Sequence, residues 1–96
     1  MKKVIQVVIY TSISDEEKLA RYAELAGPAM VEQGAKFLAR GMPVAVKESG
    51  RNTRTVVIEW ESMEAAEKGY ASEAYQNALA ALDNGAIREF RYVEAA

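Results

Sequence analysis

The sequence has 96 residues, half of them apolar, with 12 lysines and arginines against 14 aspartates and glutamates. This length predicts one domain over residues 1–96, and the net charge of −2 provides no general attraction to nucleic acid or to an anionic membrane. The sequence contains no cysteine and no histidine, which excludes disulfides, thiolate nucleophiles, histidine bases and histidine-ligated haem. We therefore expect neither a metal site nor a cofactor.

Residues 4–13, VIQVVIYTSI, predict the first strand because they are rich in β-branched side chains. Apolar residues occupy both sets of alternate positions, so both faces of this strand need cover. The stretch before it has two lysines but no small-residue cleavage site. We therefore expect a cytoplasmic protein without a signal peptide.

Residues 14–34 predict a helix. Ser14 precedes Glu17 by three positions, which is the spacing of a capping box, and Gly34 is a suitable end. Gly27-Pro28 predicts a kink or the start of the final turn. The apolar residues at helical spacing form the expected buried stripe: Leu19, Tyr22, Ala23, Ala26 and Met30.

The remaining sequence predicts strands at 35–41, 54–60 and 87–95, with a pair of helices at 62–70 and 72–85 before the last strand. This order predicts an α+β protein with the ferredoxin-like βαββαβ fold, an antiparallel sheet with its helices on one face. The other face is left bare, although the first strand is apolar on both sides. We therefore expect a homodimer in which two sheets enclose a barrel.

Arg40 ends an apolar strand, where a guanidinium group needs a partner. If the following loop is centred between Ser49 and Gly50, Arg40 lies directly opposite Glu59 on the next strand. A structural ion pair would explain both residues. Alternatively, Arg40 binds a carboxylate or enolate of a small ligand, with Glu59 orienting it or acting as a base. Arg54, at the start of the same strand as Glu59, could also reach a ligand anion or the partner subunit.

Tyrosines on the predicted helices supply hydroxyl groups to an apolar interior. GYASEAYQ places Tyr70 at the end of one helix, Ser72 at the cap of the next and Tyr75 in its first turn. Core packing and capping account for these positions, but Tyr70 and Tyr75 could instead line the mouth of a pocket between helices and sheet. The candidate ligand-binding residues are therefore Tyr22, Arg40, Glu59, Tyr70, Ser72 and Tyr75, and Glu59 and Arg40 are the catalytic candidates.

YAELAGPAM, GAKFLARG and RTVVIEWESMEAAEKGYASEAYQNAL, in this order, resemble the domain of unknown function 1330 family of the dimeric α+β barrel superfamily. The resemblance runs from about Val4 to Val93 and implies a dimer with the ferredoxin-like fold, but no established reaction. The matching positions are Tyr22, Arg40-Gly41, Glu59-Trp60, and Tyr70, Ser72 and Tyr75.

The chain departs from the family pattern in three places. Ala35 stands where a second glycine is usual, and Trp60 stands where phenylalanine is usual, which implies a smaller cavity. An arginine that is common late in the last helix is missing here. Its absence argues against a third cationic contact with a ligand.

Three functions are open at this point. The first is a dimeric protein that binds a small apolar or weakly acidic molecule. The second, which the resemblance to the superfamily implies, is a cofactor-independent monooxygenase or isomerase with Glu59 as the base and Arg40 or a tyrosine as the hydrogen-bond donor. The third is a purely structural dimerisation module without a ligand.

Overall fold

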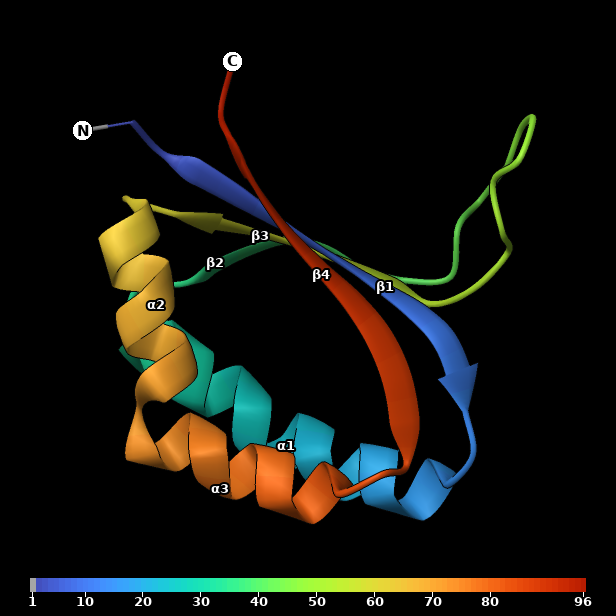
Figure 1. The fold of residues 1–96 in the computed structure, drawn as a ribbon, viewed down its shortest axis with the longest axis horizontal. Helices are drawn as coiled ribbons and strands as arrows, with labels where there is room; N and C mark the ends of the chain where they lie inside the picture. Colours follow the sequence, from blue (N-terminus) through green and yellow to red (C-terminus); the bar gives the residue numbers. More distant parts are fainter. Residues whose placement is uncertain (1) are drawn as a thin grey trace.

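The computed structural model describes residues 2–96, which form one four-stranded antiparallel sheet and three helices (Figure 1). The elements in chain order are β1 (Val4–Ile13), α1 (Glu16–Glu32), β2 (Lys36–Gly41), β3 (Thr55–Trp60), α2 (Met63–Ala71), α3 (Glu73–Leu82) and β4 (Ala86–Glu94). The strand order in the sheet is β2-β3-β1-β4, so the long apolar strand β1 is central. The predicted ferredoxin-like α+β fold is confirmed.

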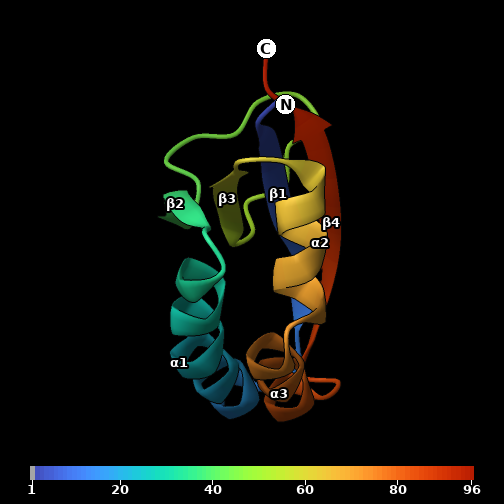
Figure 2. The ribbon, with the colours of Figure 1, turned by 90° about the vertical axis from the view of Figure 1, so that its left-hand side faces the viewer.

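The helices form a single layer on one side of the sheet. Figure 2 shows α1 and α3 next to each other below the sheet, with α2 crossing in front of β1 and β4. The loop between β2 and β3, residues 42–54, extends away from the body of the molecule (Figure 1). No helix among residues 2–96 is long and apolar enough to cross a membrane.

The N-terminal cap of helix α1 lies one residue later than predicted. Asp15 caps it, with a side-chain oxygen accepting from the backbone nitrogen of Lys18 at 3.0 Å, so the expectation that Ser14 is the cap is wrong. The helix continues past Pro28 to Glu32. Because the helix is not interrupted at Pro28, its residues at spacings of four positions all face the sheet.

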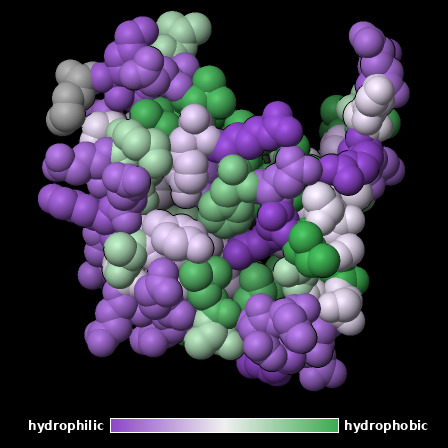
Figure 3. Space-filling view, in the orientation of Figure 1, coloured by the Kyte–Doolittle hydropathy of each residue, from purple (hydrophilic) through white to green (hydrophobic). Residues whose placement is uncertain are grey.

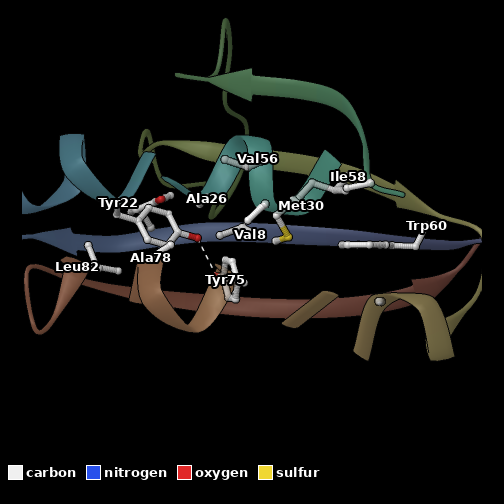
Figure 4. Packing of buried hydrophobic residues seen from close by; sticks show 14 of the residues in the cluster. Val8, Tyr22, Ala26, Met30, Val56, Ile58, Trp60, Tyr75, Ala78 and Leu82 are labelled. Atoms are coloured by element: carbon white, nitrogen blue, oxygen red, sulfur yellow. Dashed lines mark hydrogen bonds between the residues drawn. The ribbon is translucent and has the colours of Figure 1, made fainter. Parts of the chain in front are cut away.

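The core lies between the sheet and the helices (Figure 4). Trp60, at the end of β3, is almost completely buried, and its indole nitrogen donates to Gln6 Oε1 on β1 at 2.9 Å. A Cβ atom added to Gly69 of α2 would lie 2.5 Å from Cη2 of the Trp60 ring. The absence of a side chain at Gly69 is therefore what allows α2 to pack directly on this tryptophan.

The face of the sheet that points away from the helices is called the open face here. Residues of β1 alternate in burial, and Val7, which points to the open face, lies between Val57 of β3 and Arg91 of β4. Ile87 and Val93 of β4 are more than half exposed on this face. A sheet face with apolar residues at its centre that no helix among residues 2–96 covers is consistent with the expected need for a partner.

Candidate ligand-binding site

A cavity of about 260 Å³ lies between α1 and the sheet. Its apolar wall is built from both layers: Val8 of β1 and Val56 and Ile58 of β3 on the sheet side, and Ala26 and Met30 on the helix side. The strand residues reach it because alternate side chains point to one face, and the helix residues because positions four apart share a side. The cavity is thus a direct product of the two periodicities in the sequence.

Three arginines line this cavity, namely Arg40, Arg54 and Arg88. The guanidinium carbon of Arg40 lies 4.6 Å from the centre of the Phe37 ring, and that of Arg88 lies 4.7 Å from the centre of the Tyr22 ring. None of the three arginines forms a salt bridge within residues 2–96. Glu16 is the one carboxylate in the lining, so positive charge is in excess.

Arg40 lies beside Gly27 of α1. A Cβ at this position would lie 3.8 Å from Nη1 of Arg40, which places the guanidinium against the helix backbone. Arg40 lines the cavity, and its guanidinium group is held over the ring of Phe37. A cation over an aromatic ring keeps part of its charge available to a further partner.

A buried pair of tyrosines adjoins the cavity. The hydroxyl groups of Tyr22 and Tyr75 are 2.7 Å apart (Figure 4). Nη1 of Arg88 donates to the Tyr22 hydroxyl at 2.8 Å. Burial raises the pKa of Tyr22 although Arg88 opposes the shift, and burial together with neighbouring Tyr22 raises the pKa of Tyr75. Both hydroxyls therefore stay protonated at neutral pH, and because one donates to the other in their shared hydrogen bond, one proton of the pair remains for a further acceptor.

The predicted pairing of Arg40 with Glu59 is wrong. Strand β2 contains a bulge between Phe37 and Ala39, so Arg40 lies opposite Val56 while Glu59 lies opposite Lys36. One extra residue reverses the face to which every following side chain points. Arg40 consequently faces the helices, whereas Glu59 lies on the open face.

Glu59 has another partner on the open face. Its Oε1 atom is 3.5 Å from Nζ of Lys3, and it is flanked in sequence by the buried residues Ile58 and Trp60. Burial alternates along β3, which places Glu59 on the side opposite to the cavity. The two catalytic candidates of the sequence, Arg40 and Glu59, are therefore not brought together within one chain.

The other candidate residues fall in different places. Tyr22 lines the cavity, and Tyr75 is fully buried behind it. Ser72 caps α3 by accepting from the Tyr75 nitrogen at 3.2 Å, and its hydroxyl donates to the Gly69 carbonyl. Tyr70 lies outside this cavity, in a wider groove of about 910 Å³ between α2, α3 and β4.

Two further polar residues of the cavity were not expected from the sequence. Arg88 lies on β4, where REFRY alternates Arg88, Phe90 and Tyr92 on the side facing the helices. This alternation is the sequence signal that could have identified Arg88. The missing arginine of the last helix argued against a third cation in the site, but Arg88 provides one from a strand. Gln6, within the apolar run of β1, is fully buried and also lines the cavity.

Trp60 was expected to reduce the cavity volume by its bulk. It is absent from the residues lining the cavity, because its ring is enclosed by Gly69 and hydrogen-bonded to Gln6. Trp60 therefore does not border this cavity, and its effect on the cavity volume stays a prediction.

The model of a family described as a domain of unknown function (DUF1330) matches residues 6–96. No curated protein matches the chain. Among solved structures, a Rhodopseudomonas palustris protein of unknown function, RPA0582, has a TM-score of 0.79 at 12% identity, with 99% of this chain and 83% of that chain covered.

Two other similar structures carry more informative descriptions. SnoaB of Streptomyces nogalater, described as a cofactor-independent oxygenase, has a TM-score of 0.69 at 15% identity, with 100% of this chain and 95% of that chain covered. A dimeric ferredoxin-like protein of unknown function from Thermobifida fusca has a TM-score of 0.62 at 14% identity, with 98% and 92% covered. At these identities the similarity establishes the fold alone.

Proposed function

Because the chain belongs to the DUF1330 family, a family without an assigned activity, we propose a function from the cavity itself: the protein binds a small apolar molecule that carries one anionic group. The observation that carries this proposal is the set of three arginines, Arg40, Arg54 and Arg88, in a largely apolar lining that contains a single carboxylate among the described residues. A carboxylate or an enolate is the complementary ligand group, since guanidinium forms short, charge-assisted hydrogen bonds to such oxygens.

The tyrosine pair supports an anionic ligand as well. A guanidinium that already donates to the Tyr22 oxygen retains other N–H groups, because Arg88 has five donors. The protonated hydroxyls next to it cannot repel an anion. The apolar wall formed by Val8, Ala26 and Met30 would bind the rest of the molecule by excluding water from it.

Removal of the Arg88 charge is expected to weaken the binding of octanoate at least about tenfold, since a hydrogen bond to a charged group contributes about 1.5–3 kcal/mol. The substitution Arg88→Met keeps the apolar stem and leaves the Tyr22–Tyr75 hydrogen bond intact. Isothermal titration calorimetry of octanoate and of uncharged octanol measures the effect. Octanol binding should change little, because it does not need the cation.

Arg91→Met is the matched control. Arg91 lies on the same strand, but it points to the open face and pairs with Glu89 at 3.1 Å. Its loss should leave octanoate affinity within about twofold, because an exposed ion pair contributes about 0–1 kcal/mol. Equal affinities of wild type and Arg88→Met for octanoate would contradict the proposed site.

A second candidate function is the cofactor-independent enzyme. It is favoured by the Tyr22–Arg88 pair, whose donors would stabilise an enolate oxygen in an apolar cavity. Glu16 is the lining carboxylate that would take the proton from a carbon next to a carbonyl group, while the electron pair moves to the carbonyl oxygen. The roles suggested for Glu59 and Arg40 in such a reaction stay predictions, and their positions on opposite faces argue against them.

This activity would appear as deuterium exchange at the carbon next to the carbonyl group of 7-oxooctanoate in deuterated water, followed by proton NMR. Glu16→Gln should slow the exchange by about a hundredfold or more, because it removes the base. Glu17→Gln, one position along α1 and outside the cavity lining, is the control. Exchange no faster than in buffer would exclude this second function.

We also propose that the protein is a homodimer that buries the open face, as its apolar character and the dimeric T. fusca relative suggest. The loop between β2 and β3 would add contacts, since Met42, Val44 and Val46 are exposed on it. Figure 3 shows this loop projecting from the body as an arm. A cytoplasmic location is a further proposal, to be tested by cell fractionation.

A further inference from the structure

Gln6 occupies an unusual position for an amide. Its side chain is fully buried on β1 and lines the cavity, and its Oε1 atom accepts from Trp60 Nε1 at 2.9 Å. Its Nε2 atom has no hydrogen-bond partner anywhere in residues 2–96. An amide nitrogen carries two donors, so this group has unused hydrogen-bonding capacity next to the cavity.

The orientation of the amide is determined by its partner. The indole N–H of Trp60 can only donate, so the Gln6 oxygen must face it and the amide nitrogen must point elsewhere. A reversed amide would bring two donors together. The amide nitrogen of this lining residue is therefore a buried donor that is held in place by the protein, and it is complementary to a neutral acceptor such as a carbonyl oxygen.

The charged groups lie towards the other end of β1. Tyr10 is four residues from Gln6 on the same face, a distance of about 13 Å along a strand. Arg88 is the cross-strand neighbour of Tyr10, and the Tyr10 backbone nitrogen donates to the Arg54 carbonyl at 3.0 Å. Arg54 Nε is a second buried donor without a partner in the described chain. Unpartnered donors are thus separated along the cavity.

We infer that Gln6 is a specificity-determining residue that selects, among the anionic ligands of the proposed function, those with a neutral oxygen acceptor at the opposite end of an apolar segment. The ligand class is then an oxo acid or a related molecule, with its anion near Arg54 and Arg88 and its carbonyl oxygen at the Gln6 amide. This inference rests on the proposed function. A ligand without that oxygen would leave the buried amide donor unpaired.

The test compares two acids that differ by one ketone oxygen, 7-oxooctanoate and octanoate, by calorimetry on the full chain. Wild type is expected to bind the oxo acid about tenfold more tightly, because a buried donor gains a partner. Gln6→Met has a similar length and no donor, and it should reduce this preference to about twofold or less. Gln6→Met retaining the wild-type preference would overturn the inference.

Trp60→Phe tests the orientation of the amide, since it removes the indole N–H that fixes it but keeps the amide itself. It should retain only part of the preference for the oxo acid, because the amide can then rotate, whereas Gln6→Met/Trp60→Phe, which leaves neither partner unpaired, should lose it. Circular dichroism melting identifies any variant that fails to fold, and the double variant then replaces Gln6→Met. Octanoate binding without any preference in wild type overturns this inference alone, while failure of both acids to bind overturns the proposed function with it.

Discussion

Val7→Lys is expected to convert the proposed dimer into a monomer. Val7 is central on the open face, between Val57 and Arg91 on the neighbouring strands. If two copies pack their open faces together, a two-fold interface contains the substitution twice. Each lysine would then lose its hydration, at an effective cost of several kcal/mol per ion. The dimer dissociation constant should rise at least about a thousandfold, since each 1.4 kcal/mol is a factor of ten.

Sedimentation velocity over a range of protein concentrations measures this change. The control is Val31→Lys, the same substitution on α1, where the side chain is already 57% exposed and lies outside the open face. It should leave the dissociation constant unchanged. The circular dichroism spectrum of Val7→Lys should stay that of the wild type, because the lysine faces solvent in the monomer.

Two results would contradict the proposal. A wild-type protein that sediments as a monomer at all concentrations would exclude the homodimer. A dimer that persists in Val7→Lys would move the interface away from the centre of the open face, and the exposed apolar residues of the β2–β3 loop, such as Val44, would be the next surface to test.

The fold was predictable because it follows from local patterns. The β-branched run of β1, the acidic first turn and glycine end of α1, and the serine caps of α2 and α3 are each properties of a few neighbouring residues. The strand order then follows from the sequence of elements, because a strand–helix–strand unit leaves room for one antiparallel strand between its strands. None of these steps depends on a particular long-range contact.

The candidate site was predictable only in part, because it depends on register. Arg40 was identified as a candidate from the sequence. The bulge next to Phe37, which turns Arg40 to the helix side, comes from one additional residue in β2. A register that is estimated from the centre of the β2–β3 loop does not reveal such a bulge. Arg88 and Tyr22 meet across 66 positions of sequence. Such a contact follows from the assembled sheet and helix layer, and only the alternation within β4 indicated which way Arg88 points.

Gln6 illustrates the same limit. Within VIQVVIY a single glutamine gives no indication of its role, since a buried amide requires a partner that periodicity cannot name. The partner is Trp60, and the tryptophan in turn depends on the missing side chain at Gly69. Gln6 and Gly69 are far apart in the sequence but both contact Trp60 in the core. A phenylalanine at position 60 could not donate the hydrogen bond to Gln6.

Gly69→Ala is expected to lower the free energy of unfolding by about 1–2 kcal/mol. The new Cβ would lie 2.5 Å from Cη2 and 3.0 Å from Cζ3 of Trp60, so helix or ring must move, and overpacking a core costs about 1–3 kcal/mol. The higher helix propensity of alanine returns at most about 1 kcal/mol. Urea unfolding monitored by circular dichroism measures the difference. Lys68→Ala, at the exposed neighbouring position, should change it by less than about 0.5 kcal/mol.

The Trp60→Phe background separates this clash from other effects of the alanine. Phenylalanine has no atoms equivalent to Cη2 and Cζ3 in that position, so Gly69→Ala should there be neutral or stabilising, since only the helix-propensity gain remains. The coupling energy of the double-mutant cycle should then be about 1–3 kcal/mol. An equal loss of stability in both backgrounds would mean that the Trp60 ring is not the reason why position 69 requires a glycine. A positive coupling would establish that Gly69 and Trp60 form one packing unit, which holds the Gln6 amide in the orientation that the proposed specificity requires.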